Sequence, residues 1–168
     1  MIRPSHRTGT ARSFVFFTLC VAAALSQPAH AAIDLTDDAG NTVRLETPAK
    51  RIVSLAPHIT ELLFAAGAGP AVVGVVAYSD YPPEATALPQ VGGYTKVDLE
   101  AVAALRPDLV VAWRSGNRDT HLDRLRALGI PVFINEPRSL DDVARSLEQI
   151  GQLTGTEGVA NEAAQAFR

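Results

Sequence analysis

The chain has 168 residues and carries 15 Lys and Arg against 18 Asp and Glu, a formal net charge of −3 at pH 7. An acidic balance without a basic stripe lacks the electrostatic footprint of a nucleic-acid binder, so no nucleic-acid partner is expected. The length suits a single domain of ordinary size.

The first 31 residues have the pattern of a secretory signal peptide. Three arginines precede an apolar stretch over residues 13–25, which is too short to span a membrane. Ala29 and Ala31 then place small residues at the usual positions of a cleavage site before Ala32. We therefore predict a cleavable signal peptide over residues 1–31 and a periplasmic location.

Removal of this segment would change the composition of the chain. Twelve basic and eighteen acidic residues would remain, which is a net charge of −6. Cys20 would be lost, because it lies in the apolar stretch after Leu19 rather than after the small residue of a lipoprotein signal. The mature chain would then contain no cysteine, which excludes disulfides, thiolate metal sites and a cysteine nucleophile.

The first half of the mature chain is expected to form a hairpin followed by a strand–helix–strand unit. In order, the expected elements are strands at 33–35 and 43–45 around the turn-rich residues 37–41, a strand at 51–55, a helix at 60–66 closed by Gly67, and a strand at 72–76. An irregular stretch with three prolines follows over residues 78–95. Loops this long are often functional.

The second half continues the alternation of apolar strands and helices. The expected elements are a helix at 97–105, a strand at 109–112, a helix at 120–128 capped by Gly129, a strand at 131–134, a helix capped by Ser139, and a helix at 157–168. This alternation predicts an α/β fold, with a parallel sheet flanked by helices on both faces. The last helix has no Gly, Asn or Pro stop signal, so we expect the chain to be a truncated part of a longer protein.

The large aromatic rings of the mature chain follow the predicted strands rather than lying within them. Tyr78 and Tyr81 come after the strand at 72–76, Tyr94 lies in a glycine turn, and Trp113 ends the strand at 109–112. Ligands of open α/β sheets bind beyond the carboxyl ends of the strands. Each ring could instead fold over its own strand as a lid. Together the rings predict a receptor for a large, flat, partly apolar ligand.

Two histidines remain in the mature chain. His121 lies beside Asp119 and Asp123 in a predicted helix and is expected to be a solvated surface residue. His58 follows Pro57 at the carboxyl end of the first core strand, where it could cap the helix, contact a ligand or coordinate a metal through neutral imidazole. One histidine with no Cys or second His nearby does not make a zinc site, so no metal site is predicted.

No catalytic constellation is visible in the sequence. It contains no Gly-x-Ser-x-Gly elbow, no phosphate-binding glycine-rich loop and no His-Glu-x-x-His helix. We therefore assign no catalytic residue and do not expect an enzyme.

Five short segments occur in a characteristic order and spacing. They are residues 55–62, 78–83, 98–100, 105–110 and 112–117. Together they resemble the N-terminal lobe of the periplasmic cobalamin-binding proteins, the receptor components of ABC importers, which belong with the haem and ferric-siderophore receptors. The Tyr-Ser-Asp-Tyr-Pro-Pro and Trp-Arg-x-Gly-Asn segments distinguish the cobalamin branch.

The resemblance implies roles for individual residues. Tyr78, Tyr94 and Trp113 match aromatic positions that pack on the corrin, although Tyr94 stands where relatives carry Trp. Glu100 matches a glutamate that docks to arginines of the permease, which suits an exposed carboxylate in a first helical turn. Further candidate ligand-binding residues near these rings are Pro57, His58, Arg114 and Asn117.

The resemblance also implies an architecture and a function. Residues 32–154 would form one Rossmann-like lobe, residues 155–168 would begin the long helix between lobes, and the second lobe would be missing. The protein would capture cobalamin or a related corrinoid as transported ligand, without a cofactor of its own, and deliver it as a monomer to an ABC importer permease. Two alternatives remain: a receptor for haem or a ferric siderophore, and an exported α/β enzyme whose catalytic half is missing.

Overall fold

A parallel four-stranded sheet forms the centre of the computed structural model, which describes residues 31–168. Its strand order is β4-β3-β7-β8, with bounds Val72–Val75 (β4), Ile52–Ser54 (β3), Leu109–Trp113 (β7) and Val132–Asn135 (β8). All three strand pairs are parallel, so the four carboxyl ends lie at one edge of the sheet. The predicted parallel sheet is confirmed.

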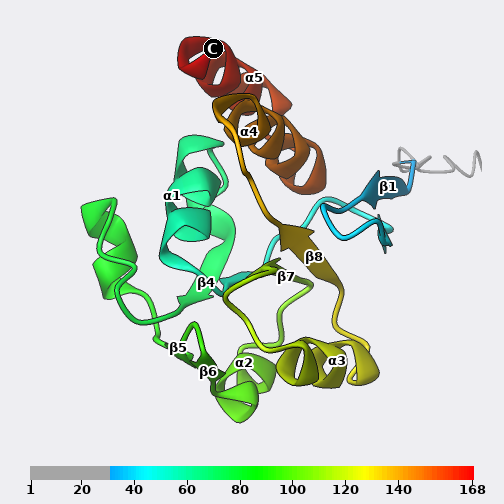
Figure 1. The fold of residues 1–168 in the computed structure, drawn as a ribbon, viewed down its shortest axis with the longest axis vertical. Helices are drawn as coiled ribbons and strands as arrows, with labels where there is room; N and C mark the ends of the chain where they lie inside the picture. Colours follow the sequence, from blue (N-terminus) through cyan, green and yellow to red (C-terminus); the bar gives the residue numbers. More distant parts are fainter. Residues whose placement is uncertain (1–30) are drawn as a thin grey trace, which may run out of the picture.

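Five helices cover the two faces of the sheet (Figure 1). They are α1 (Pro57–Ala65), α2 (Leu99–Ala104), α3 (Asp119–Ala127), α4 (Leu140–Thr154) and α5 (Glu157–Phe167). One apolar core joins α1, α4 and α5 to one face, and a second joins α2 and α3 to the other. The sequence prediction of an α/β fold with helices on both faces is therefore confirmed.

The predicted hairpin of β1 (Ile33–Thr36) and β2 (Thr42–Leu45) is present and docks beside β8. The carboxylate of Asp37 accepts hydrogen bonds from the backbone of Ala39 and Asn41, which closes the turn, and from Ile134 N at 3.2 Å. Asp38 N donates to Ile134 O at 3.0 Å. The acidic turn therefore satisfies backbone groups along the free edge of β8.

Helix α1 begins three residues earlier than the sequence pattern indicated. Pro57 occupies its first turn, where the missing N–H and the restricted φ of proline are compatible with a helix, and the extended Ala56 precedes it. His58 therefore lies inside the helix, and no side chain caps its start. The suggestion that His58 caps this helix is wrong.

The irregular stretch after β4 contains short elements of its own. They are a 3-10 helix at Pro83–Ala87 and the paired strands β5 (Gly92–Gly93) and β6 (Lys96–Val97); another 3-10 helix, Gly69–Ala71, precedes β4. Val91 N donates to Val75 O at 2.8 Å, and Val91 O accepts from Asp98 N at 2.9 Å. The stretch is thereby held against β4 and α2.

Helices α4 and α5 pack closely against each other at one end of the molecule (Figure 1). Helix α4 ends at Gly155, which has a φ of 71°; a glycine in this left-handed conformation is a common helix end. Ala160 and Ala164 are buried against α4, and Arg168 donates to Glu148 at 2.7 Å.

None of the helices within residues 31–168 is long and apolar enough to cross a membrane. Residues 1–30 of the predicted signal peptide, with Cys20, lie outside the described part.

Candidate ligand-binding site

The order of the sheet creates a crevice between the carboxyl ends of β3 and β7. From β3 the chain passes through α1 to β4 on one side, and later from β7 through α3 to β8 on the other. The two crossovers use opposite faces of the sheet, so the loops after β3 and β7 diverge. Such a switch point is where open α/β sheets bind ligands. His58 and Trp113 lie at this point.

Three of the predicted site rings are in contact there. The rings of His58 and Trp113 lie edge to face, with centroids 5.2 Å apart and an interplanar angle of 85°. The ring of Tyr94 is tilted by 48° to Trp113 at a centroid distance of 6.0 Å. These separations are typical of favourable aromatic pairs. His58 and Tyr94 lie 55 and 19 positions before Trp113 in the sequence, and the fold brings the three rings into one aromatic group.

Trp113 is held in place from behind. Its ring lies directly on Gly116, where a Cβ atom would collide with the six-membered ring. Its backbone N–H donates to Asn117 Oδ1 at 2.7 Å, and Asn117 N–H donates back to Trp113 O at 2.9 Å. The loop after β7 is therefore a tight turn that holds the indole against its own backbone.

Asn117 was expected to contact the ligand, but the structure places it beneath the site. The residue is only 5% exposed, and its Nδ2 donates to Leu55 O at 2.9 Å and to Tyr94 O at 2.8 Å. With Oδ1 bound to Trp113 N–H, the side-chain amide is committed to three backbone groups. Asn117 therefore positions three loops and presents no free group to a ligand.

The loop that carries Tyr78 is fixed by a buried chain of hydroxyl groups. Thr60 Oγ1 of α1 lies 2.8 Å from Ser54 Oγ at the end of β3 and 3.1 Å from Ser79 Oγ, and all three residues are buried. Tyr78 adopts φ of 68°, which is uncommon for a residue with a side chain, and is 76% exposed. A buried Ser79 beside a projecting Tyr78 holds the phenol out from the sheet edge.

A carboxylate links the loops after β7 and β8. Glu136 accepts hydrogen bonds from Ser115 Oγ at 2.8 Å and Ser115 N at 3.0 Å. Its own N–H donates to Asp38 Oδ2 at 2.7 Å. Glu136 was not among the residues predicted from the sequence, because nothing in its local pattern separates it from a solvated loop residue.

The imidazole of His58 is half-buried, and burial lowers its pKa. The negative charges of Glu136 and then Glu61 oppose this shift and raise the pKa in part. Within residues 31–168, neither ring nitrogen has a hydrogen-bonding partner, and neither is sealed from solvent. The neutral imidazole is therefore the favoured form at neutral pH, with a free lone pair.

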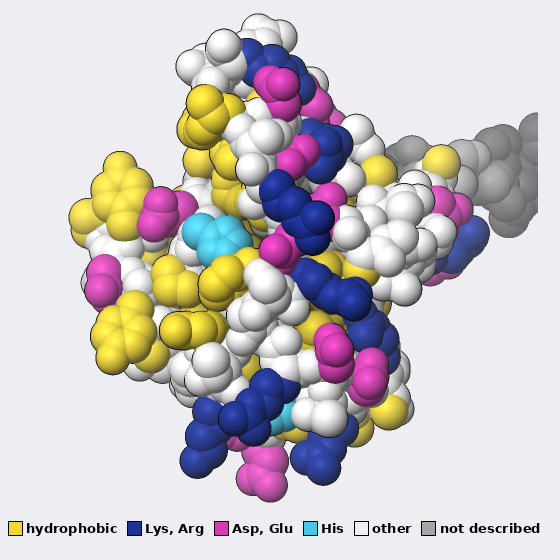
Figure 2. Space-filling model, viewed as in Figure 1, with side chains coloured by type: hydrophobic (Ala, Val, Ile, Leu, Met, Phe, Trp, Pro, Cys, Tyr) yellow, Lys and Arg dark blue, Asp and Glu magenta, His cyan; other side chains and the backbone are white. Residues whose placement is uncertain are grey.

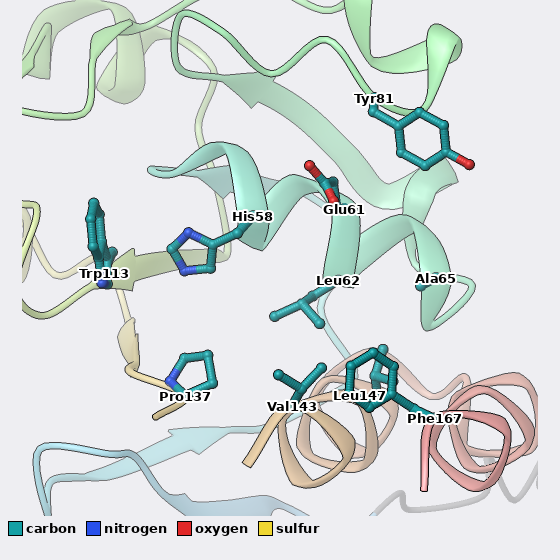
Figure 3. Close-up of a pocket in the computed structure, with 10 residues that line it drawn as sticks. All are labelled: His58, Glu61, Leu62, Ala65, Tyr81, Trp113, Pro137, Val143, Leu147 and Phe167. Atoms are coloured by element: carbon teal, nitrogen blue, oxygen red, sulfur yellow. The ribbon is translucent and has the colours of Figure 1, made fainter. Parts of the chain in front are cut away.

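A mostly apolar cavity of about 510 Å³ opens next to His58 and Trp113 (Figure 3). Beyond these two rings its walls come from α1, α4, α5 and the loops, as Glu61, Leu62, Ala65, Tyr81, Pro137, Val143, Leu147 and Phe167. In Figure 2, which has the view of Figure 1, hydrophobic side chains gather on the left half of the molecule, beside a band where basic and acidic side chains alternate. Tyr81 was not among the predicted site residues, although it lies in the same sequence segment as Tyr78.

The remaining predicted residues lie around this group. Pro57 starts α1, and Arg114 is exposed beside Trp113. Glu100 is exposed in the first turn of α2, in a second hollow of about 680 Å³ that Lys96 and Arg124 also line. Glu100 thus lies in a different hollow from His58 and Trp113, and its role in docking stays a prediction.

His121, in this second hollow, differs from the expectation of a fully solvated residue. It is half-buried, and its Nδ1 is buried without a hydrogen-bonding partner. No group of three or more His, Cys, Asp or Glu side chains that could hold a metal ion is found in residues 31–168.

A family model described as periplasmic binding protein matches residues 52–168. The chain belongs to the periplasmic binding protein family. Among its relatives, the vitamin B12-binding protein of Yersinia pestis (strain Pestoides F) is 44% identical over 120 residues, which make up 71% of this chain and 43% of that protein.

Solved structures of the family show the same fold. The periplasmic vitamin B12-binding protein BtuF of Vibrio cholerae has a TM-score of 0.69 and 40% identity, over 72% of this chain and 48% of that chain. The periplasmic haem-binding protein RhuT from Roseiflexus sp. RS-1 has a TM-score of 0.63 and 34% identity, over 70% and 45%. This chain therefore spans less than half the length of these relatives, as one α/β lobe of the family fold does.

Proposed function

We propose that this periplasmic binding protein captures cobalamin or a related corrinoid at the crevice between β3 and β7. The observation that carries the proposal is the contact group of His58, Trp113 and Tyr94 at the carboxyl edge of the sheet. The proposal is supported by the vitamin B12-binding relatives, which are 40% and 44% identical to this chain.

The chemistry of the site suits a large, flat and partly apolar ligand. Flat rings and an apolar cavity offer dispersion contacts and burial, and the few polar groups nearby would fix orientation. Tyr78 stands out from the sheet edge, where it can close on one side of a ligand plane. The lobe therefore provides one wall of a binding cleft rather than a closed pocket, and the cobalamin is cargo, not a cofactor.

We further propose that the loaded protein, located in the periplasm, delivers its cargo as a monomer to an ABC importer through a surface that includes Glu100. The carboxylate of Glu100 is exposed at the start of α2, whose backbone N–H groups are already capped by Asp98. It is thus free to form charge-assisted hydrogen bonds with arginines of a permease.

The binding experiment is a titration of the purified protein with cyanocobalamin, followed by absorbance and calorimetry. Haemin and a ferric siderophore serve as competitors. Saturable corrinoid binding that neither competitor displaces would support the proposal. Preferential binding of haemin would favour the second candidate, a haem receptor, which the similarity to RhuT makes the nearest alternative. Turnover of a substrate without a stable complex would instead favour an exported enzyme.

A further inference from the structure

His58 is the only one of the two histidines in residues 31–168 that lies at the carboxyl edge of the sheet. It follows β3 directly, in the first turn of α1, between the aromatic contact with Trp113 and the apolar cavity. Its position therefore faces the same crevice that the proposed function assigns to the corrinoid.

The orientation of the ring leaves its nitrogens unused by the protein. In Figure 3 the carbon between the two nitrogens points toward the face of Trp113, and the nitrogens point to either side, one of them into the cavity toward Pro137. No group within residues 31–168 accepts from or donates to either nitrogen. Both nitrogens remain open to solvent, so either is available to a ligand that enters the crevice.

Protonation does not block these nitrogens. Burial lowers the pKa of His58, and the opposing carboxylates of Glu136 and Glu61 offset this only in part. A neutral imidazole with a free lone pair is the form of histidine that binds metals. Trp113 on one side and the helical backbone on the other restrict the ring, so little freedom would be lost on coordination.

We propose that His58 coordinates the metal centre of the bound corrinoid, in the axial position that a water molecule occupies in the free ligand. The proposal rests on the proposed function, because it requires a corrinoid in the crevice. A bond from one imidazole nitrogen to Co(III) forms, the bond from cobalt to water breaks, and the water leaves. No electron is transferred, and the neutral imidazole has no proton to lose at the coordinating nitrogen.

This coordination makes a prediction about which corrinoids bind best. Aquocobalamin has an exchangeable water on cobalt, whereas cyanide in cyanocobalamin holds the same position firmly. The coordinate bond therefore adds affinity for the aquo form and none for the cyano form, whereas ring contacts with the ligand are common to both. We expect aquocobalamin to bind at least about tenfold more tightly, at the low end of the effects seen when metal-site partners are removed.

The test is a pair of spectroscopic titrations with the mature protein from Ala32 onward, without a histidine tag, so that no other imidazole competes near the N-terminus. Aquocobalamin and cyanocobalamin are titrated with the wild type, with His58→Gln and with His121→Gln as the matched control. Coordination predicts a shift of the aquocobalamin absorption bands toward those of an imidazole complex in the wild type and in His121→Gln. His58→Gln should abolish the shift and bring the ratio of the two dissociation constants to about one, because a loss of ring packing weakens the binding of both corrinoids alike and cancels in that ratio.

Loss of function through misfolding is distinguished by a second variant. His58→Ala removes every side-chain atom that could coordinate, and melting curves of both His58 variants show whether the fold is intact. Binding of both corrinoids with equal affinity and no band shift in the wild type would overturn the coordination and leave the proposed function standing. Absence of binding of either corrinoid would overturn both.

Discussion

Trp113 illustrates how a single side chain in this crevice depends on its supports. Its indole lies on Gly116, its backbone is bonded to Asn117, and its free side meets His58 and Tyr94. It also packs against the core on the side of α1 and α4. Trp113 therefore belongs to both the proposed ligand surface and the fold, whereas Tyr78 would serve only the proposed ligand surface.

Tyr78→Ala and Trp113→Ala are expected to weaken corrinoid binding, each by about 2 kcal/mol or more if the ring is an anchor of the site. Tyr78→Ala should leave the melting temperature unchanged, because the side chain projects into solvent. Trp113→Ala should also lower it, because the ring contacts the core. Calorimetric titration and melting curves on both variants measure this, and unchanged affinity in both would remove these rings from the site.

His58 should make the stability of the protein depend on pH. Its pKa in the folded state lies below its ordinary value of about 6.5, so below that pH the unfolded chain binds a proton that the folded chain resists. The stability that the neutral His58 contributes is fully present above about pH 6.5, and it is lost as the pH falls from there toward the pKa of His58 in the folded state. Urea denaturation between about pH 7.5 and pH 5 should show a smaller loss of stability in His58→Gln than in the wild type. Equal losses would assign the dependence to other groups.

At the scale of elements, two features can be tested by substitution: the start of α2 and the contact between α4 and α5. Asp98 caps α2 by accepting from Glu100 N and Ala101 N, which leaves the Glu100 side chain without a structural task. Helices α4 and α5, in contrast, approach so closely that only a glycine fits between them.

Glu100→Arg should impair cobalamin uptake while leaving ligand affinity nearly unchanged, because the carboxylate lies on a separate surface from the aromatic group. The matched control is Asp119→Arg, which places the same charge in the first turn of the neighbouring helix α3 and carries the same cost against the helix dipole. Uptake and binding are measured side by side. A parallel fall in both for Glu100→Arg would make the residue structural or ligand-facing.

Gly151→Ala should destabilise the protein by roughly 1–3 kcal/mol, because the added methyl group would meet Ala160 Cβ at 2.5 Å and overpack the contact between α4 and α5. Gly158→Ala is the control within α5, where an added Cβ meets nothing within 4 Å. It should stabilise the helix slightly, by up to about 1 kcal/mol. Chemical denaturation of the two variants gives the difference, and equal effects would rule out close packing at Gly151.

At the scale of the whole molecule, the lobe presents an open surface. Val159 and Phe167 of α5 are 53% and 44% exposed, and Phe167 lines the cavity beside His58. The crevice is bounded on one side by the sheet edge and on the other by solvent. Because this chain spans less than half the length of its relatives, its affinity need not equal theirs.

The 168-residue chain by itself is expected to bind cobalamin with a dissociation constant of about 1 μM or weaker. A nanomolar complex requires roughly −12 kcal/mol. Three aromatic anchors at about 2 kcal/mol each provide half of this even if their contributions added fully, and the entropy of association must be met as well. Titration of the mature chain with cyanocobalamin, with light scattering to establish that it is monomeric, measures the affinity. A nanomolar complex with the monomer would show that one lobe suffices.

The sequence by itself determined the class of fold and the edge of the sheet at which the proposed ligand surface lies. Alternating apolar strands and amphipathic helices are local patterns, and a parallel sheet places every strand end at the same edge, so Tyr78, Tyr94 and Trp113 could be assigned to it in advance. Ser139 as the cap of α4 and the hairpin turn at 37–41 followed from equally local rules.

Only the tertiary structure decided which of these residues meet and what supports them. The partners of Asn117 lie 62 and 23 positions away, the cavity joins α1 to the end of α5, and Glu136 binds a serine of another loop. Such contacts follow from strand order and helix packing, which no local periodicity encodes. For the same reason, only the structure shows that Asn117 is buried beneath the proposed ligand surface and that Tyr81 lines the cavity.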